Sequence, residues 1–116
     1  MTKIVSFPKS AHHTLDAQLR FAIANKRLLR FTYDGAMRVA EPHDYGVRNR
    51  ETKVLAFQRE KAGRKSDNVR GWRWLDISKI QDCVVLEETF RGSRRTANQQ
   101  HHQWDVLYAR VDDDET

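Results

Sequence analysis

The sequence lacks the residues and runs that mark several protein classes. Its 116 residues include one cysteine, Cys83, so no disulfide can form within the chain and a cysteine-rich zinc site is excluded. Apolar runs long enough for a signal peptide or a membrane-spanning helix are missing. The length suits one domain. These absences predict a soluble cytoplasmic domain with no membrane partner.

Motifs for catalysis and cofactor binding are also missing. The sequence has no glycine-rich phosphate loop, no Gly-x-Ser-x-Gly and no His-Glu-x-x-His. The histidine pairs at 12–13 and 101–102 are poor metal ligands, since adjacent side chains diverge. We therefore predict no enzyme, no cofactor and no metal site. The best residues for acid/base chemistry, as an alternative, are Glu41, His43 and Asp44.

Positive charge dominates the chain. It carries 21 lysines and arginines against 16 aspartates and glutamates, a formal net charge of +5. Four of those acids occupy positions 112–115, so residues 1–111 hold 21 basic and 12 acidic side chains, a net charge of +9. A basic domain of this kind favours anionic partners such as nucleic acid or nucleotides.

A flexible leader (residues 1–13) and then a helix (residues 14–26) are predicted at the start of the chain. Thr14 can cap the first turn through its hydroxyl, and Asp16 would meet the positive end of the helix dipole. Helical spacing then places one apolar stripe on Leu15, Leu19, Ala22 and Ile23.

After the helix the hydrophobic period changes from 3.6 to 2, which indicates strands. Asp34-Gly35 predicts a hairpin turn, and Pro42 marks an edge, a bulge or a strand break. A long flexible loop is expected over residues 59–70, which have little to bury. One helix followed by five short strands predicts a mainly β (α+β) fold, a small barrel. The strands are expected near residues 28–33, 37–47, 52–58, 71–76 and 83–90.

Residues 91–116 are predicted to form a polar tail. The first part of this tail is either a plain connector or an arm that contacts phosphate through its arginines, which are Arg91, Arg94 and Arg95. Residues 104–111 recover apolar character and could add an extra strand, with a helix as the alternative. The acidic end from residue 112 is expected to be disordered.

Several of these segments, taken in order, resemble the WYL domain. The resemblance covers about residues 15–90 and rests on a Tyr-x-Gly-x-x-Arg-x-x-x-Pro-like core, a Val-Leu-Ala-Phe strand, Trp-x-Asp-Ile-x-Lys-Ile and Val-Leu-x-x-x-Phe. These motifs are anchored here by Tyr33, Arg38, Pro42, Leu55, Trp74, Ile80, Leu86 and Phe90. It implies a bacterial domain folded as a Sm-like five-stranded barrel with a leading helix. It also implies the ligand-sensing half of a transcription regulator, with nucleic acids and nucleotides as ligands.

The chain departs from that family at three points. Of the Trp-Tyr-Leu that names it, only Leu55 remains, and Asp76 stands where a ligand-binding arginine often sits. The thirteen residues before the helix leave no room for a winged helix-turn-helix. We therefore expect a stand-alone, divergent WYL-like domain, whose protein partner would be a second copy or a separate DNA-binding regulator.

The candidate ligand-binding cluster comprises Tyr33, Arg38, His43, Gln58 and Arg73. The first two match the family pattern, and the other three follow from strand neighbourhood. The planar fork of arginine suits bidentate phosphate recognition, while tyrosine or histidine can stack a base. The alternative is that Arg38 pairs with Glu41 or Asp34 on a solvated hairpin face.

A second candidate is the basic loop, whose cations would contact nucleic acid: Arg59, Lys61, Arg64, Lys65 and Arg70. Together with Arg73, residues 59–73 hold six cations against two acids, a net charge of +4. Trp72 and Trp74 would share the strand face opposite Arg73, so aromatic rings and that arginine would not serve one surface. The alternative is a solvated loop beside core tryptophans.

Taken together, these patterns predict a ligand-sensing module of the WYL type. It would bind an anionic ligand, single-stranded nucleic acid or a nucleotide, in a regulatory role. The alternative is a protein-interaction or oligomerisation module that uses barrel edge strands and the C-terminal segment.

Overall fold

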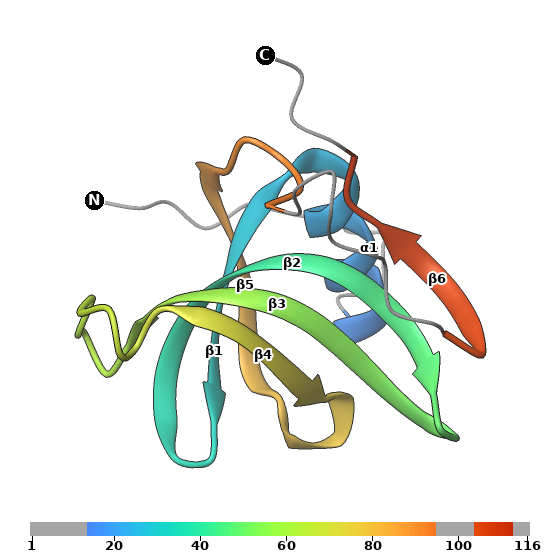
Figure 1. The fold of residues 1–116 in the computed structure, drawn as a ribbon, viewed down its shortest axis with the longest axis horizontal. Helices are drawn as coiled ribbons and strands as arrows, with labels where there is room; N and C mark the ends of the chain where they lie inside the picture. Colours follow the sequence, from blue (N-terminus) through green and yellow to red (C-terminus); the bar gives the residue numbers. More distant parts are fainter. Residues whose placement is uncertain (1–13, 95–103, 113–116) are drawn as a thin grey trace.

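Helix α1, which spans Leu15–Asn25, opens the described structure as the sequence predicts (Figure 1). The computed structural model describes residues 14–94 and 104–112. The hydroxyl of Thr14 accepts a hydrogen bond from the Ala17 amide at 3.1 Å, and Lys26 ends the helix with a φ of 54°. Neither α1 nor any other helix in these ranges is long and apolar enough to cross a membrane.

Tight turns join the first three strands. β1 (Arg27–Tyr33) and β2 (Ala36–Arg48) meet at the predicted turn, where Asp34 and Gly35 have φ of 49° and 78°. Positive φ at both positions is the geometry of a type I′ hairpin. β3 (Glu51–Lys61) follows through a second turn of the same sign, at residues 49–50.

The connection between β3 and β4 (Gly71–Asp76) is shorter than expected. We predicted a loop over residues 59–70, but β3 continues to Lys61, so Arg59 and Lys61 are strand residues. Residues 62 and 63 then turn the chain with φ of 51° and 79°, and Lys61 and Arg64 bridge across this turn. The correction arises because the ladder with β2 extends further than the apolar pattern does: Arg38 of β2 lies opposite Lys61.

The chain ends with a short 3-10 turn and two further strands. Turn η1 (Ile77–Lys79) leads to β5 (Gln81–Thr89), which pairs with β1. β6 (Val106–Arg110) pairs with the second half of β2, where Tyr45 lies opposite Ala109. Residues 104–111 therefore contain a strand and not the alternative helix.

All six strands form one antiparallel sheet in the order β4-β3-β2-β1-β5, with β6 attached to β2 off this path. The sheet is strongly curved: β2 and β3 cross the front of Figure 1, and β1 and β5 run steeply behind them. In the described residues no ladder joins β4 to β5. The fold is thus mainly β with one helix; no described ladder closes the sheet, so the expected barrel is not confirmed.

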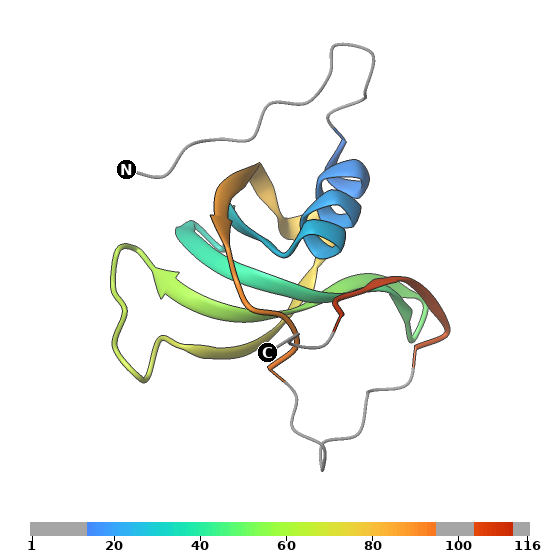
Figure 2. The ribbon, with the colours of Figure 1, turned by 90° about the horizontal axis from the view of Figure 1, so that it is seen from above.

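α1 lies against one face of the curved sheet (Figure 2), and the buried core residues come from both. α1 contacts β1, β2, β5 and β6 through its buried stripe. Pro42 is accommodated by a register shift between Pro42 and Asp44, so it marks a bulge rather than the end of a strand. The buried apolar side chains include Leu19, Ile23, Leu28, Phe31, Tyr45, Val54, Leu75, Val85 and Leu86.

Candidate functional site

A basic cavity of about 410 Å³ lies where the β3–β4 connection folds over the ends of β2, β3 and β4. We call it the Arg38 cavity. Its size falls in the range of small-molecule sites. Its lining residues are Arg38 from β2, Gln58 and Lys61 from β3, Arg73 from β4, and Ala62, Arg64, Asn68 and Val69 from the connection.

A β-bulge at Arg59 brings Gln58 and Lys61 to this one cavity. Val39 pairs with Glu60 and Ala40 with Gln58, so β3 has one extra residue at this point. In a regular strand, residues three apart face opposite sides. The extra residue reverses that parity beyond position 59, and both side chains line the same space.

Arg38 is the most buried cation of the cavity, with 8% of its surface exposed. Nη1 donates to the Gln58 side-chain oxygen at 3.1 Å, and Nη2 donates to the Tyr33 carbonyl at 3.1 Å. Nε is buried without a hydrogen-bond partner. Two of the five guanidinium donors are therefore used within the described structure. A buried cation with unused donors is a position that an anion would stabilise.

The carbonyl of Val69 ties the connection to the floor of the cavity. It accepts hydrogen bonds from Gln58 Nε2 at 2.7 Å and from Arg73 Nη2 at 3.1 Å. Gln58, which is 2% exposed, thus bridges Arg38 and the connecting segment. The shape of the cavity depends on this chain of polar contacts.

The lining carries four cations and, among the described residues, no carboxylate. Arg38, Lys61, Arg64 and Arg73 each lack an ion pair in this part of the chain. Glu41, which we considered as a partner for Arg38, instead binds Arg94 on another side of the molecule. Within residues 14–94 and 104–112, no lining carboxylate therefore neutralises the positive charge of the cavity.

Three of the five predicted cluster residues meet here: Arg38, Gln58 and Arg73. Tyr33 touches the site from outside the lining, with its ring centroid 5.2 Å from the Arg38 guanidinium carbon. Its hydroxyl accepts a hydrogen bond from the Asp76 amide at 3.0 Å. Tyr33 therefore supports Arg38 and does not offer a stacking surface in the cavity.

His43 is not brought to the Arg38 cavity. Its ring lies 4.7 Å from the Trp72 ring, edge-on, and 5.5 Å from the Phe90 ring, stacked. Nδ1 donates to the Glu41 carbonyl at 2.9 Å, and Nε2 accepts from the Arg94 amide at 3.1 Å. This pattern requires the neutral ring protonated at Nδ1. His43 is fully buried and anchors the segment that follows β5.

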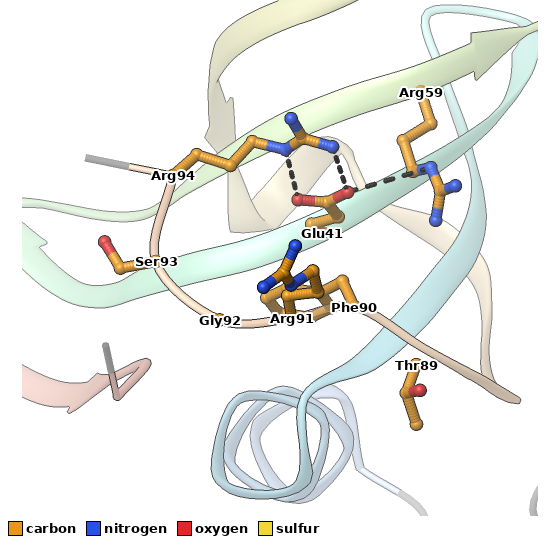
Figure 3. A pocket seen from close by; sticks show the side chains of 8 residues that line it. All are labelled: Glu41, Arg59, Thr89, Phe90, Arg91, Gly92, Ser93 and Arg94. Atoms are coloured by element: carbon orange, nitrogen blue, oxygen red, sulfur yellow. Dashed lines mark hydrogen bonds and ion pairs between the residues drawn. The ribbon is translucent and has the colours of Figure 1, made fainter. Parts of the chain in front are cut away.

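A second cavity, of about 420 Å³, lies under that segment and contains Glu41 (Figure 3). Arg94 binds the Glu41 carboxylate through Nε at 2.6 Å and Nη2 at 2.8 Å, and Arg59 approaches it to 3.7 Å. The hydrogen bond to Glu41 raises the pKa of Arg94 above its usual range. Glu41 is thus held as a structural anion.

Asp44 has a similar structural role beside β6. It accepts hydrogen bonds from Arg110 at 3.0 and 3.1 Å and from the Trp104 indole at 3.2 Å, and it is fully buried. The three residues considered for acid/base chemistry, Glu41, His43 and Asp44, therefore anchor the C-terminal segment. Residues 91–94 and 104–112, predicted as part of a polar tail, pack on the sheet through them.

The basic-loop residues divide between two faces. Lys61 and Arg64 line the Arg38 cavity, whereas Arg59 approaches Glu41. Arg70 lies over the Phe57 ring at 5.7 Å, and Lys65 is exposed.

The tryptophans of β4 lie on the face opposite Arg73, as the alternation predicts. Trp72 packs edge-on against Phe57, and Trp74 lies 5.6 Å from Trp104. These two indole rings therefore cannot stack a base that is bound in the Arg38 cavity.

Sequence reasoning missed the contribution of the connection, namely Asn68 and the Val69 carbonyl. A backbone acceptor leaves no mark in side-chain patterns. Among the described residues, no group of three or more His, Cys, Asp or Glu could hold a metal ion. The histidine pairs at 12–13 and 101–102 and Arg95 lie outside the described ranges.

Comparisons with protein-family models, with curated proteins and with solved structures find no match to this chain.

Proposed function

We propose that this chain is a module of the WYL type that binds an anionic ligand, single-stranded nucleic acid or a nucleotide, in a regulatory role. The Arg38 cavity is the binding site. One observation carries the proposal: a nearly buried arginine with unused donors forms the floor of a cavity with three further cations and no carboxylate among its described lining residues.

Electrostatics supports this function. Removing a guanidinium from water without a compensating carboxylate costs several kcal/mol in order of magnitude, and the contact with the Tyr33 ring offsets only part of that cost. A phosphate in the cavity would supply the missing negative charge and accept charge-assisted hydrogen bonds. The cavity is therefore best suited to a phosphate-bearing ligand.

The WYL assignment rests on the sequence motif and on how its residues lie. Tyr33 and Arg38, which carry the central part of the resemblance, are in direct contact at the site. The leading helix and the strand order suit a Sm-like barrel, whose closure between β4 and β5 is part of the proposal. The regulatory role and the cytoplasmic location follow from the same resemblance and from the sequence composition.

Binding of a labelled oligothymidylate, followed by fluorescence anisotropy at roughly 50 mM salt, tests the proposal, since phosphate contacts are strong at low salt. We expect saturable binding that weakens steeply as salt rises. Arg73→Gln should lose roughly tenfold or more in affinity, the effect of one charge-assisted hydrogen bond. Arg38→Gln should lose at least as much, with its fold checked by circular dichroism.

Lys65→Gln is the matched control, because Lys65 has the same charge and lies next to Arg64 but does not line the cavity. Lys65→Gln should lower the affinity for the oligonucleotide by no more than about twofold, typical of one exposed charge near a binding site. No binding at low salt, or an equal loss in the Arg73 and Lys65 variants, would overturn the proposal.

A second candidate function is protein interaction through β6. Val106, Leu107 and Tyr108 are 50%, 40% and 38% exposed, which is unusual for three successive apolar side chains. If a second copy covers this strand, Val106→Lys should convert a dimer to a monomer in size-exclusion chromatography and leave oligonucleotide binding intact. A monomeric parent protein would remove this candidate.

A further inference from the structure

The Arg38 cavity has a buried floor and an exposed rim. Arg38 and Gln58 are 8% and 2% exposed, whereas Lys61, Arg64 and Asn68 are exposed residues around the opening. Arg73 has intermediate exposure and joins the two levels. An anion that contacts only the rim would leave Arg38 unneutralised, so a group that satisfies the floor must enter the cavity.

No aromatic ring belongs to the described lining of the cavity. The rings nearest in sequence, Trp72 and Trp74, lie on the opposite face of β4 and pack against Phe57, His43 and Trp104. Stacking is the usual way in which a protein holds a nucleobase of a single strand. The described lining of the cavity can therefore recognise a phosphate group but has no ring on which a base could stack.

Two phosphate groups differ in how they fit such a cavity. An internal phosphodiester carries one negative charge and a chain on both sides, so it can lie along the rim but enters a closed-floored cavity poorly. A phosphate monoester has one substituent, a charge of about −1.5 to −2 at neutral pH and three acceptor oxygens. The four cations and the unused donors of Arg38 match the second group.

We infer that the Arg38 cavity recognises a phosphate monoester, the terminal phosphate of a nucleotide or of a nucleic-acid strand, in preference to an internal phosphodiester. This inference rests on the proposed function and specifies its ligand class. The terminal phosphate enters the cavity as far as Arg38 and Arg73. From the rim, Lys61 and Arg64 neutralise its charge. The attached sugar and base stay outside. Recognition is then independent of base sequence.

Two oligothymidylates that differ at one end provide the test. Each has roughly ten nucleotides, within the site size of small single-strand-binding folds, and a fluorophore at the 3′ end. One carries a 5′-phosphate and the other a 5′-hydroxyl. We expect the phosphorylated strand to bind roughly tenfold tighter or more, as one added charge-assisted hydrogen bond would give. Thymidine 5′-monophosphate should compete, and thymidine should not.

The variants assign the preference to the cavity. Arg73→Gln should reduce the preference for the phosphorylated strand to about twofold or less, because it removes a donor that the terminal group uses. Lys79→Gln, at an exposed lysine of η1 that does not line the cavity, should preserve it. Equal binding of the two strands would overturn the inference and leave the proposed function standing, and absence of binding by either strand would overturn both. If thymidine 5′-monophosphate competes as well as the strand, the ligand is a free nucleotide; if it competes weakly, the ligand is a strand end.

Discussion

Arg94 binds Glu41 through two parallel hydrogen bonds, 2.6 Å from Nε and 2.8 Å from Nη2, although the two residues are 53 positions apart. The backbone amide of Arg94 also donates to His43 Nε2 at 3.1 Å. Arg94 alone thus provides hydrogen bonds to both a buried carboxylate and a buried imidazole. These contacts fix the segment after β5 over the second cavity.

Arg94→Gln is expected to destabilise the fold by about 1–3 kcal/mol, since removing one partner leaves a buried carboxylate without its main hydrogen-bond donor. The loss stays at the lower end of that range because Arg59 remains 3.7 Å from Glu41. Urea unfolding followed by circular dichroism measures it. The double variant Arg94→Gln/Glu41→Gln should recover part of the loss. A single variant as stable as the parent would contradict the structural role of the pair.

Gly46→Ala should dislodge β6. A β-carbon at position 46 would collide with the backbone carbonyl of Val106, which belongs to the neighbouring strand and cannot rotate away. We expect a stability loss of about 1–3 kcal/mol, typical of overpacking, and faster proteolysis after residue 104. Gly35→Ala is the contrasting case, because open space surrounds it and its φ of 78° alone opposes a side chain. Unchanged stability and proteolysis in Gly46→Ala would contradict the packing of β6 on β2.

Local patterns predicted the parts of the fold that local chemistry decides. The cap at Thr14 and the turn at Asp34-Gly35 depend on residues within four positions of each other, and both are confirmed. The bulge at Arg59 and the salt bridge from Arg94 were not predicted, because each depends on a partner strand or on a residue far along the chain.

The spatial grouping of the candidate cluster was likewise predicted only in part. Strand neighbourhood correctly brought Gln58 and Arg73 to Arg38, because cross-strand pairing follows from the hairpin order. His43 was placed in the same cluster, yet a residue five positions from Arg38 on one strand faces the other side of a sheet. Alternation alone could have separated them. The Val69 carbonyl could not have been found, since any residue supplies one.

The thiol of Cys83 should be unreactive in the folded protein. Burial raises the pKa of Cys83 to about 12, so at about pH 8 very little thiolate is present in the native state. We expect a thiol-reactive disulfide reagent to label the native protein more slowly than the denatured protein by on the order of a thousandfold, since an exposed thiol has a pKa near 8.5 and the thiolate fractions differ by that factor. Equal labelling rates with and without denaturant would show that the side chain is accessible. Cys83→Ser provides the background.

The hydrogen bond from the Tyr45 hydroxyl to Asp16 Oδ1, 2.7 Å long, should make part of the stability depend on acidic pH. This bond, and then the Arg20 side chain, lower the pKa of Asp16 below its usual value of 3.8. A carboxyl whose folded-state pKa is lowered stabilises the fold fully above the unfolded-state pKa, and the contribution is lost as pH falls through the folded-state pKa.

Tyr45→Phe should therefore reduce the free energy of unfolding by about 0.5–1 kcal/mol at neutral pH, a small value because the pair is partly exposed. The difference between parent and variant should shrink as pH falls below the ordinary aspartate pKa and through the lowered folded-state pKa, because Asp16 then becomes protonated in both. As a control, in an Asp16→Asn background the stability loss caused by Tyr45→Phe should no longer change with pH. If the stability loss caused by Tyr45→Phe in the parent protein is the same at acidic and neutral pH, the Asp16 carboxylate is not the group that the Tyr45 hydroxyl stabilises.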